Sequence, residues 1–319
     1  MGILKLPTSD YFRLEQLDDG VYAAFATEDQ GVWSNSGIVD LGDAALVFDT
    51  FLTATAAADL RRTAKDLMQR PIQYVINSHY HFDHVLGNQV FSDAIIISTT
   101  RTRELIQSDL GGADLPSLSA LLSESIQELD RDRTGHKDER IRRAIDNEIN
   151  ERRKFIEALP TLQITLPTVT FEHQLQIHGS RRTVEVVTYG GGHTPSDAFL
   201  YLPSEKIAFM GDLVLVDTHP MIGDQGNPSE WLTILDKVSM LNIDAIVPGH
   251  GNIGNQRNIS DMRQYLTRVE RHVENAMRDG ISLESLLAED VPNQYADWRF
   301  SHVYAWNLTT LYNKSYRPV

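Results

Sequence analysis

Alternating apolar and polar residues, together with short apolar runs, predict that much of this chain forms short strands. The segments with these patterns are 20–27, 37–41, 44–49, 72–76, 94–98, 163–171, 175–178, 183–189, 198–202, 207–210 and 245–247. Gly42-Asp43, between the second and third segments, is typical of a hairpin turn. Two series of strands, each accompanied by helices, predict two sheets packed face to face with helices outside.

Apolar residues spaced three and four positions apart predict helices between and after these strands. The helical segments are 53–70, 101–107, 229–241, 259–277 and 282–288. Pro71 ends the first helix because proline cannot continue one, and Gly280 is positioned to cap the fourth.

Residues 115–159 differ from the rest because two apolar stripes at helical spacing flank a highly charged stretch. The stripes consist of Leu118, Leu121, Leu122, Ile126 and Leu129, followed by Ile141, Ile145, Ile149 and Ile156. This pattern predicts a helical hairpin that turns near Thr134-Gly135. The charged bend is compatible with a solvated surface, a lid over a site or a dimer contact, and the sequence leaves these alternatives open.

A histidine-rich segment follows the strand 72–76 and has the spacing of a metal site. It reads His79-Tyr80-His81-Phe82-Asp83-His84. On a helix, residues two apart point in nearly opposite directions, so His79 and His81 converge only in a loop that leaves the strand. Three further residues stand beside glycine at the ends of apolar runs: His193, Asp212 and His250. Glycine lets the backbone turn sharply at such strand ends, so all these residues could share one centre.

The order and spacing of these motifs resemble those of the metallo-β-lactamase fold superfamily of metallohydrolases. Its signature is His-x-His-x-Asp-His, then a distant His, an Asp after Gly and a last His, and the match spans about residues 20–254. The resemblance implies an α/β protein with the αββα four-layer sandwich of that superfamily. We therefore expect a single domain over residues 1–319, with a helical insertion at about 101–160 and a C-terminal helical region at about 258–319.

The same resemblance implies a metal-binding role for each motif residue. It assigns His79, His81 and His193 to one metal ion, Asp83, His84 and His250 to the other, and Asp212 to a bridge between them. Imidazole and carboxylate ligands without sulfur suit two zinc ions, and manganese or iron is also compatible. Asp83 is expected to be catalytic as well, orienting a metal-bridging hydroxide and passing its proton to the leaving group. Asp49, at the end of an apolar run, is a candidate partner for a metal-binding imidazole or a helix N-cap.

Two close metal ions can lower the pKa of a shared water, which makes hydrolysis feasible without a serine or cysteine nucleophile. We therefore expect a dinuclear zinc-dependent hydrolase that acts on an ester, lactone or thioester bond of a small molecule. The alternatives are a phosphodiester-type metallohydrolase and a weak β-lactamase. Dedicated zinc β-lactamases of the superfamily have Cys, Ser or another residue where Asp212 stands, which argues against penicillins as the main substrate.

Two other classes of protein are disfavoured by the motif. Di-iron redox enzymes of this fold typically have Glu where His81 stands and carry an additional flavin domain. A non-catalytic metal-binding protein is disfavoured by the complete ligand set, because a purely structural zinc site is usually closed by four protein ligands.

Composition and charge limit the classes of partner that this protein is expected to bind. The 319 residues carry a formal net charge of -15 without a long Lys/Arg block, which argues against nucleic acid and anionic membranes. No cysteine is present, so disulfides and thiolate chemistry are excluded. The first residues lack the pattern of a secretory signal and no apolar run has transmembrane length, so we expect a cytoplasmic protein. The aromatic residues between 298 and 306 indicate core packing or a homodimer contact, with substrate contact as the alternative.

Overall fold

The computed structural model describes residues 6–112, 114–135 and 139–315, and the chain divides into two compact units. The first unit is Met1–Val186 and the second is Val187–Val319. Each unit has its own buried apolar cluster. The mixed α/β architecture with two sheets confirms the expected fold class, whereas the expectation of a single domain stays a prediction. Among the described residues, no helix combines the length and the apolar character that crossing a membrane requires.

The first unit contains a seven-stranded sheet in which strand order follows chain order. Its strands are β1 (Phe12–Asp18), β2 (Val21–Ala26), β3 (Ser36–Asp40), β4 (Ala45–Phe48), β5 (Ile72–Ile76), β6 (Ile95–Thr99) and β7 (Val169–Phe171). Strands β1 to β4 pair antiparallel and β4 to β7 pair parallel. The carboxyl ends of β4, β5 and β6 therefore lie at one edge of the sheet.

Two of these strands differ from the sequence pattern. β1 adds to the predicted strands, and its alternation is weak because Phe12 alone in it is buried. β7 begins at Val169, later than the predicted 163, and follows Pro167, whose nitrogen cannot donate to a sheet.

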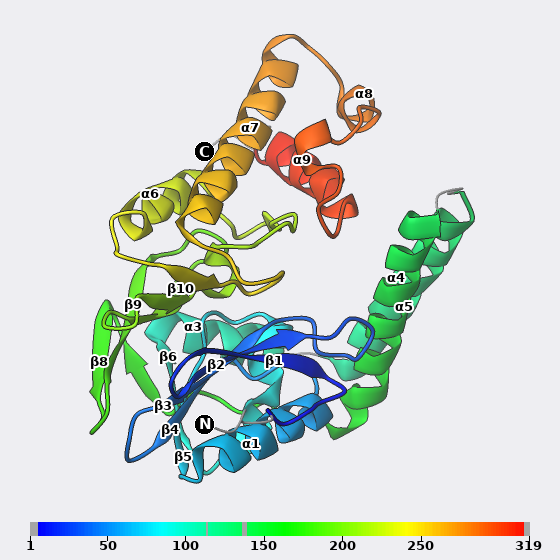
Figure 1. Ribbon diagram of the computed structural model, residues 1–319. Coiled ribbons are helices and arrows are strands. Elements are labelled where there is room, and N and C mark those ends of the chain that lie inside the picture. The colour runs from blue at the N-terminus through cyan, green and yellow to red at the C-terminus, as the bar shows by residue number, and fades with distance from the viewer. Residues whose placement is uncertain (1–5, 113, 136–138, 316–319) are drawn as a thin grey trace. The chain divides into compact units, whose positions relative to one another are not determined.

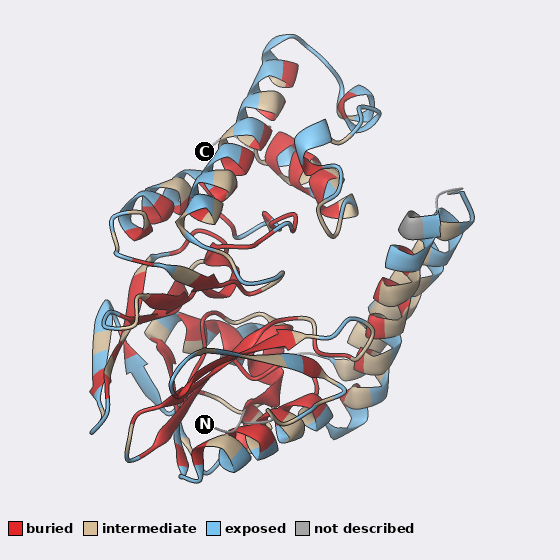
Figure 2. Ribbon diagram, in the orientation of Figure 1, coloured by how far each residue is buried: buried red, intermediate tan, exposed pale blue. Residues whose placement is uncertain are grey.

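Helix α1 (Ala54–Met68) packs on one face of this sheet (Figure 1). Thr53 is its N-cap, and the Thr53 hydroxyl accepts a hydrogen bond from the Ala56 amide. Leu60 and Ala64 of the predicted apolar stripe are fully buried, and Figure 2 shows that the opposite side of α1 is exposed. The helix thus covers the sheet from which the histidine-rich segment leaves.

The predicted helical hairpin is present as α4 (Leu115–Gly135) and α5 (Glu139–Ala158), which lie side by side (Figure 1). It follows α3 (Thr100–Leu105) and a π-helical turn, η2 (Ile106–Leu110). The expected turn at Thr134-Gly135 is the end of α4, and residues 136–138 lie outside the described residues. Leu121, expected on an apolar stripe, is instead 63% exposed. Among the described hairpin residues, the fully buried ones belong to α5.

The second unit holds β10 (Asp197–Leu202), β11 (Ile207–Phe209) and β12 (Ala245–Val247). They belong to a five-stranded sheet of order β12-β11-β10-β9-β8, and the unit boundary falls within β9 (Thr183–Gly190), after β8 (Gln174–His178). β11 pairs antiparallel with β10 and parallel with β12. The helices of this unit are η4 (Gly211–Leu213), α6 (Pro228–Val238), α7 (Gln256–Arg278), α8 (Leu283–Leu287), η5 (Asn293–Tyr295) and α9 (His302–Ser315).

The core of the second unit gathers aromatic side chains from distant segments. Trp231 of α6 and Tyr265 of α7 are fully buried. Tyr265 stacks on Trp298, with ring centroids 5.5 Å apart. Tyr304 is also buried, so core packing is confirmed for this part of the C-terminal aromatic segment, while Trp306 is 50% exposed.

Candidate metal centre

The histidine-rich segment begins where β5 ends. His79 and His81 lie in the loop, whereas Asp83 and His84 lie on a short helix, α2 (Phe82–Val85), which has His81 as its N-cap. The expected loop is therefore wrong for the second half of the motif. An acidic residue in the first turn of a helix is favoured by the helix dipole, which accounts for Asp83 at this place.

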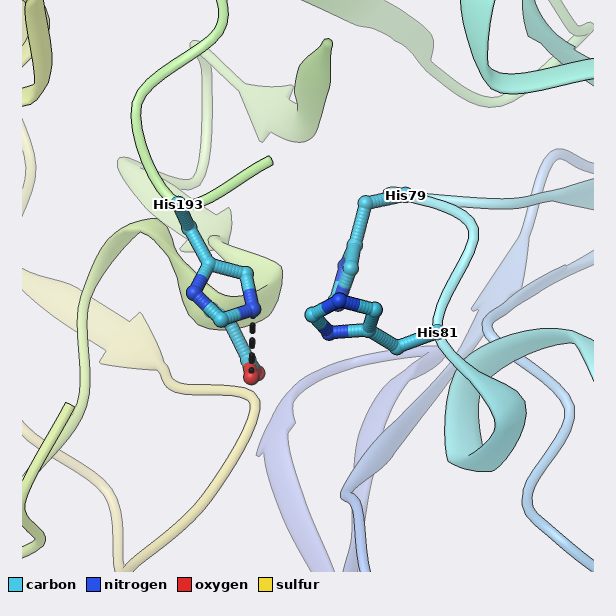
Figure 3. Close-up of side chains that lie close together, drawn as sticks. His79, His81 and His193 are labelled. Atoms are coloured by element: carbon cyan, nitrogen blue, oxygen red, sulfur yellow. Dashed lines mark ion pairs between the residues drawn. The ribbon is translucent and has the colours of Figure 1, made fainter. Parts of the chain in front are cut away.

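These four side chains lie close together within the first unit. The rings of His79 and His81 are 4.7 Å apart and nearly perpendicular (Figure 3), and those of His79 and His84 are 4.2 Å apart. A ring nitrogen of His79 lies within 4.8 Å of one of His81. Oδ2 of Asp83 lies 3.4 Å from Nε2 of His84. Three of the four are buried and His81 is half-buried, so the segment concentrates metal-binding groups away from bulk water.

Asp49 follows β4 at the same sheet edge and accepts three hydrogen bonds from this segment. Its Oδ1 accepts from the Ser78 amide, and its Oδ2 accepts from the Ser78 hydroxyl and from Nδ1 of His84, each at 2.8 Å. Burial raises the pKa of the Asp49 carboxyl above its ordinary value, although His84 and Ser78 act against this shift. Of the two roles expected for Asp49, contact with a motif imidazole, that of His84, is confirmed, and Thr53 is the helix N-cap instead.

The hydrogen bonds show which ring nitrogen carries the proton in two of these imidazoles. Nδ1 of His84 donates to Asp49. Nδ1 of His79 donates to the Ser78 hydroxyl at 2.9 Å, because that hydroxyl already donates to Asp49. Each ring therefore keeps its lone pair on Nε2, which is the atom a metal ion needs.

In the second unit, His193 stands in a tight turn between β9 and β10 that Asp197 closes. Oδ2 of Asp197 accepts from the Gly192 amide at 2.8 Å, and Oδ1 accepts from the Thr194 hydroxyl at 2.7 Å. Burial raises the pKa of the Asp197 carboxyl, while His193 and these donors lower it, with burial dominating. A Cβ at Gly192 would lie 2.7 Å from Cα of Trp231, so the turn requires glycine at this position.

Two contacts fix the ring of His193. Its Nδ1 donates to the Met221 carbonyl at 3.1 Å, and its ring packs on that of Trp231 with centroids 5.3 Å apart. Trp231 is itself held by a 3.0 Å hydrogen bond from its Nε1 to the Leu213 carbonyl. Protonation at Nδ1 again leaves Nε2 of His193 available to a metal ion.

Asp212 and His250 follow the adjacent parallel strands β11 and β12. The Gly249 amide donates to the Gly211 carbonyl at 2.7 Å, which joins the two turns. Oδ2 of Asp212 lies 3.3 Å from Nε2 of His193, the dashed contact in Figure 3, and 3.4 Å from Nε2 of His250. One carboxylate oxygen thus stands between two imidazoles.

These separations fit metal ligands better than direct ion pairs. A charge-assisted hydrogen bond would measure about 2.7–2.9 Å. In a tetrahedral site with bonds of about 2.0–2.1 Å, neighbouring ligand atoms lie about 3.3–3.4 Å apart. The pairs with this separation are Asp83 with His84, Asp212 with His193, and Asp212 with His250. The donor atoms therefore fit a divalent metal ion.

The structure brings the predicted ligands together within each unit. The first unit holds His79, His81, Asp83 and His84, and the second holds His193, Asp212 and His250. Of their supporting partners, only Asp49 was predicted. Ser78 and Asp197 stand beside the ligand motifs, so their polar side chains were an available signal. The Met221 carbonyl offers no such signal, because a backbone group is common to every residue.

Comparison with known proteins identifies the family. The sequence profile of the metallo-beta-lactamase superfamily matches residues 31–250, which include every predicted ligand. The chain therefore belongs to the metallo-beta-lactamase superfamily, which binds divalent metal ions and is generally hydrolytic. This membership confirms the resemblance seen in the motifs.

The individual relatives are distant. A "Beta-lactamase-like protein 2 homolog" from Caenorhabditis elegans is 28% identical over 109 residues, which cover 33% of this chain and 35% of that protein. A metallo-beta-lactamase from Pontibacter korlensis has a similar structure, with a TM-score of 0.58 and 18% identity over 80% of this chain and 99% of that chain. At this identity the likeness shows the fold alone.

Proposed function

We propose that this protein is a dinuclear zinc-dependent hydrolase of a small molecule. The two ligand sets would bind two ions, one held by His79, His81 and His193 and the other by Asp83, His84 and His250. The observation that carries the proposal is the position of Asp212, whose Oδ2 lies 3.3 Å from Nε2 of His193 and 3.4 Å from Nε2 of His250. Since the assignment gives these imidazoles to different ions, an oxygen between them supports a bridging role for Asp212.

When bound, two divalent ions polarise the bond to be cleaved and lower the pKa of a shared water toward neutrality. The chain supplies orientation and proton transfer. Asp49 and Ser78 hold His84 and His79 in the tautomer with the lone pair on Nε2. Asp83, buried beside His84, is the carboxylate that would accept a proton from the attacking water and pass it to the leaving group.

Zinc is the proposed metal because imidazole and carboxylate donors suit it and the ligand separations agree with tetrahedral bonds. The same donor types also accept manganese and iron. A metal assay is therefore the first test. Protein purified without added metal is expected to contain about two zinc ions per chain by plasma mass spectrometry.

Variants locate the metal on the proposed ligands. His250→Ala is expected to lower the zinc content, because it removes one ligand of one ion. His173→Ala is the matched control, since His173 is exposed and outside the motifs, and it is expected to keep the wild-type content. Equal zinc content in both variants would contradict the ligand assignment. About two iron ions in the wild type would contradict zinc as the metal and turn the search toward redox chemistry.

An ester, lactone or thioester bond is the proposed target. The carboxylate of Asp212 resembles the bridging position of lactonases and thioesterases of this fold more than that of dedicated β-lactamases. A net charge of -15 also supports a small substrate over nucleic acid. The test compares model esters, thioesters and lactones with bis-p-nitrophenyl phosphate and a chromogenic cephalosporin.

The substrate panel distinguishes the alternatives. We expect the highest kcat/KM on an ester, lactone or thioester, and its loss in Asp83→Asn with zinc still bound. A preference for bis-p-nitrophenyl phosphate would contradict this activity and identify phosphodiester hydrolysis instead. A preference for the cephalosporin would identify the protein as a β-lactamase. Activity that is unchanged in Asp83→Asn would contradict the catalytic role of Asp83.

Two further expectations belong to this proposal. A cytoplasmic location is the first, and fractionating the cells that make the protein tests it. A homodimer is the second expectation, in which Trp306, 50% exposed, would lie at the contact. Light scattering is expected to give twice the 36.0 kDa chain mass, and a 36.0 kDa particle would exclude the dimer.

A further inference from the structure

The Met221 carbonyl that accepts the His193 proton lies in a segment without regular secondary structure. The Met221 side chain is 36% exposed and provides little anchorage. The position of the carbonyl therefore depends on what holds the neighbouring residues, Pro220 and Ile222. Both are buried.

Asn307 of α9 holds both neighbours. Its Oδ1 accepts from the Ile222 amide at 2.7 Å, and its Nδ2 donates to the Pro220 carbonyl at 2.7 Å. The two hydrogen bonds enclose the peptide groups of Met221. α9 lies beyond residue 250, where the match to the family profile ends, so Asn307 stands outside the matched segment.

The amide of Asn307 is fully buried and its hydrogens are satisfied. Its Nδ2 also donates to the Tyr265 hydroxyl at 3.1 Å. The Tyr265 hydroxyl in turn donates to Nδ1 of His219 at 3.0 Å, and Nε2 of His219 donates to the Tyr295 carbonyl at 3.1 Å. Burial lowers the pKa of His219 to about 4, so its ring is neutral near pH 7 and can accept from Tyr265. Both polar atoms of the Asn307 side chain therefore have partners.

We propose that Asn307 is a positioning residue for the metal ligand His193. Asn307 fixes Pro220 and Ile222, which fix the Met221 carbonyl. The carbonyl then fixes the Nδ1-protonated tautomer and the ring orientation of His193. The inference rests on the proposed metal function, but every contact in it lies within the second unit.

The first experiment measures the tautomer of His193 in metal-free protein, by long-range proton–nitrogen NMR above neutral pH. In the wild type, His193 is expected to carry its proton on Nδ1. Asn307→Leu removes the three hydrogen bonds at nearly the same volume and is expected to give a mixture of Nδ1 and Nε2 tautomers. An unchanged tautomer in Asn307→Leu would overturn the proposal, whether or not the protein binds zinc.

The second experiment measures zinc affinity by competition with a chelator. Asn307→Leu is expected to bind zinc roughly 10- to 100-fold more weakly, the range found when the partner of a metal-binding histidine is removed. Tyr265→Phe is the matched control, because it cuts the network on the other side of Asn307 and leaves the contacts to Pro220 and Ile222. It is expected to keep the wild-type affinity and tautomer.

The pattern across variants separates positioning from general stability. Equal losses of affinity in Tyr265→Phe and Asn307→Leu would overturn the proposal, because they would show an effect of the whole buried network. If Asn307→Leu does not fold, Asn307→Asp decides by the same criteria, since it keeps an acceptor for the Ile222 amide but loses the donor to Pro220. A wild type that shows the Nδ1 tautomer but binds no divalent ion would contradict the proposed function and leave the tautomer test of Asn307 valid.

Discussion

Nδ1 of His84 donates to Oδ2 of Asp49 across 2.8 Å, and both side chains are completely buried. The two residues are 35 positions apart in the chain. They meet because Asp49 follows β4 and the segment of His84 follows β5, and these two strands pair in parallel. A carboxylate behind a metal-binding imidazole fixes the ring and makes Nε2 a stronger donor to the metal.

Asp49→Asn is expected to weaken zinc binding roughly 10- to 100-fold, because the neutral amide has one acceptor oxygen where the carboxylate has two. Chelator competition measures this change. Asp66→Asn, on the exposed side of α1, is the control and is expected to bind like the wild type. An Asp49→Asn protein with unchanged affinity would show that this contact does not support the metal site.

Gly249→Ala is expected to lower zinc affinity at least about tenfold, because a misplaced ligand weakens a site whose bond lengths allow little variation. A Cβ at Gly249 would collide with Oδ1 of Asp212 and would lie 2.8 Å from the carbonyl carbon of Gly211. Gly223→Ala is the matched control, since no atom lies within 4 Å of its added Cβ. Similar zinc affinity in both variants would mean that Asp212 can move without affecting the site.

His219 is expected to make the second unit sensitive to acid. Burial lowers its pKa from 6.5 to about 4, so between these pH values the imidazole is protonated in the unfolded chain and neutral in the folded chain. Its contribution is present above pH 6.5 and is lost as the pH falls toward 4, by about 3 kcal/mol in total. Denaturant unfolding across this range should show a steeper loss for the wild type than for His219→Gln. Parallel curves for the two proteins would contradict the low pKa, and His178→Gln, an exposed control, should follow the wild type.

Glu151 of α5 is expected to change the pH dependence of stability in the direction opposite to that of His219. Its carboxylate accepts from the Gly31 amide at 2.7 Å and from the Gln30 amide at 3.1 Å, yet burial raises its pKa from 4.5 to about 6. The stability it contributes is complete below pH 4.5 and is lost as the pH rises through 6, by about 2 kcal/mol. Subtracting the unfolding free energy of Glu151→Gln from that of the wild type should reveal this fall.

The control for Glu151 is Glu157→Gln, which changes an exposed carboxyl on the same helix. Its stability should follow the wild-type dependence on pH. If the difference between wild type and Glu151→Gln is constant from pH 4 to pH 7, burial does not shift this group as described.

Signals that act between neighbouring residues were sufficient for most elements. Strands β5 and β12 have the predicted bounds, 72–76 and 245–247, and α1 lies inside the predicted 53–70. Periodicity, a capping threonine and a following proline all act within a few positions, so they can be seen in the sequence. The seven proposed metal ligands were found in the same way, because their types and spacing form a local pattern at each strand end.

Local signals failed where contacts from elsewhere in the chain decide the outcome. Leu121 has the spacing of a buried stripe, yet it is 63% exposed because burial depends on which surface the helix meets. Asp83 and His84 lie in a helical turn within a segment predicted as loop, and the His84 carbonyl of that turn accepts a 3.0 Å hydrogen bond from the Thr50 amide.

The residue types that can bind metal, and their order, are a property of the amino-acid sequence alone. The groups that orient those ligands depend on the folded chain. Ile222 and Asn307 are 85 positions apart, and the Met221 carbonyl they position carries no side-chain signature. Because hydrogen bonding needs groups within about 3 Å, such partners exist only once strands and helices have packed.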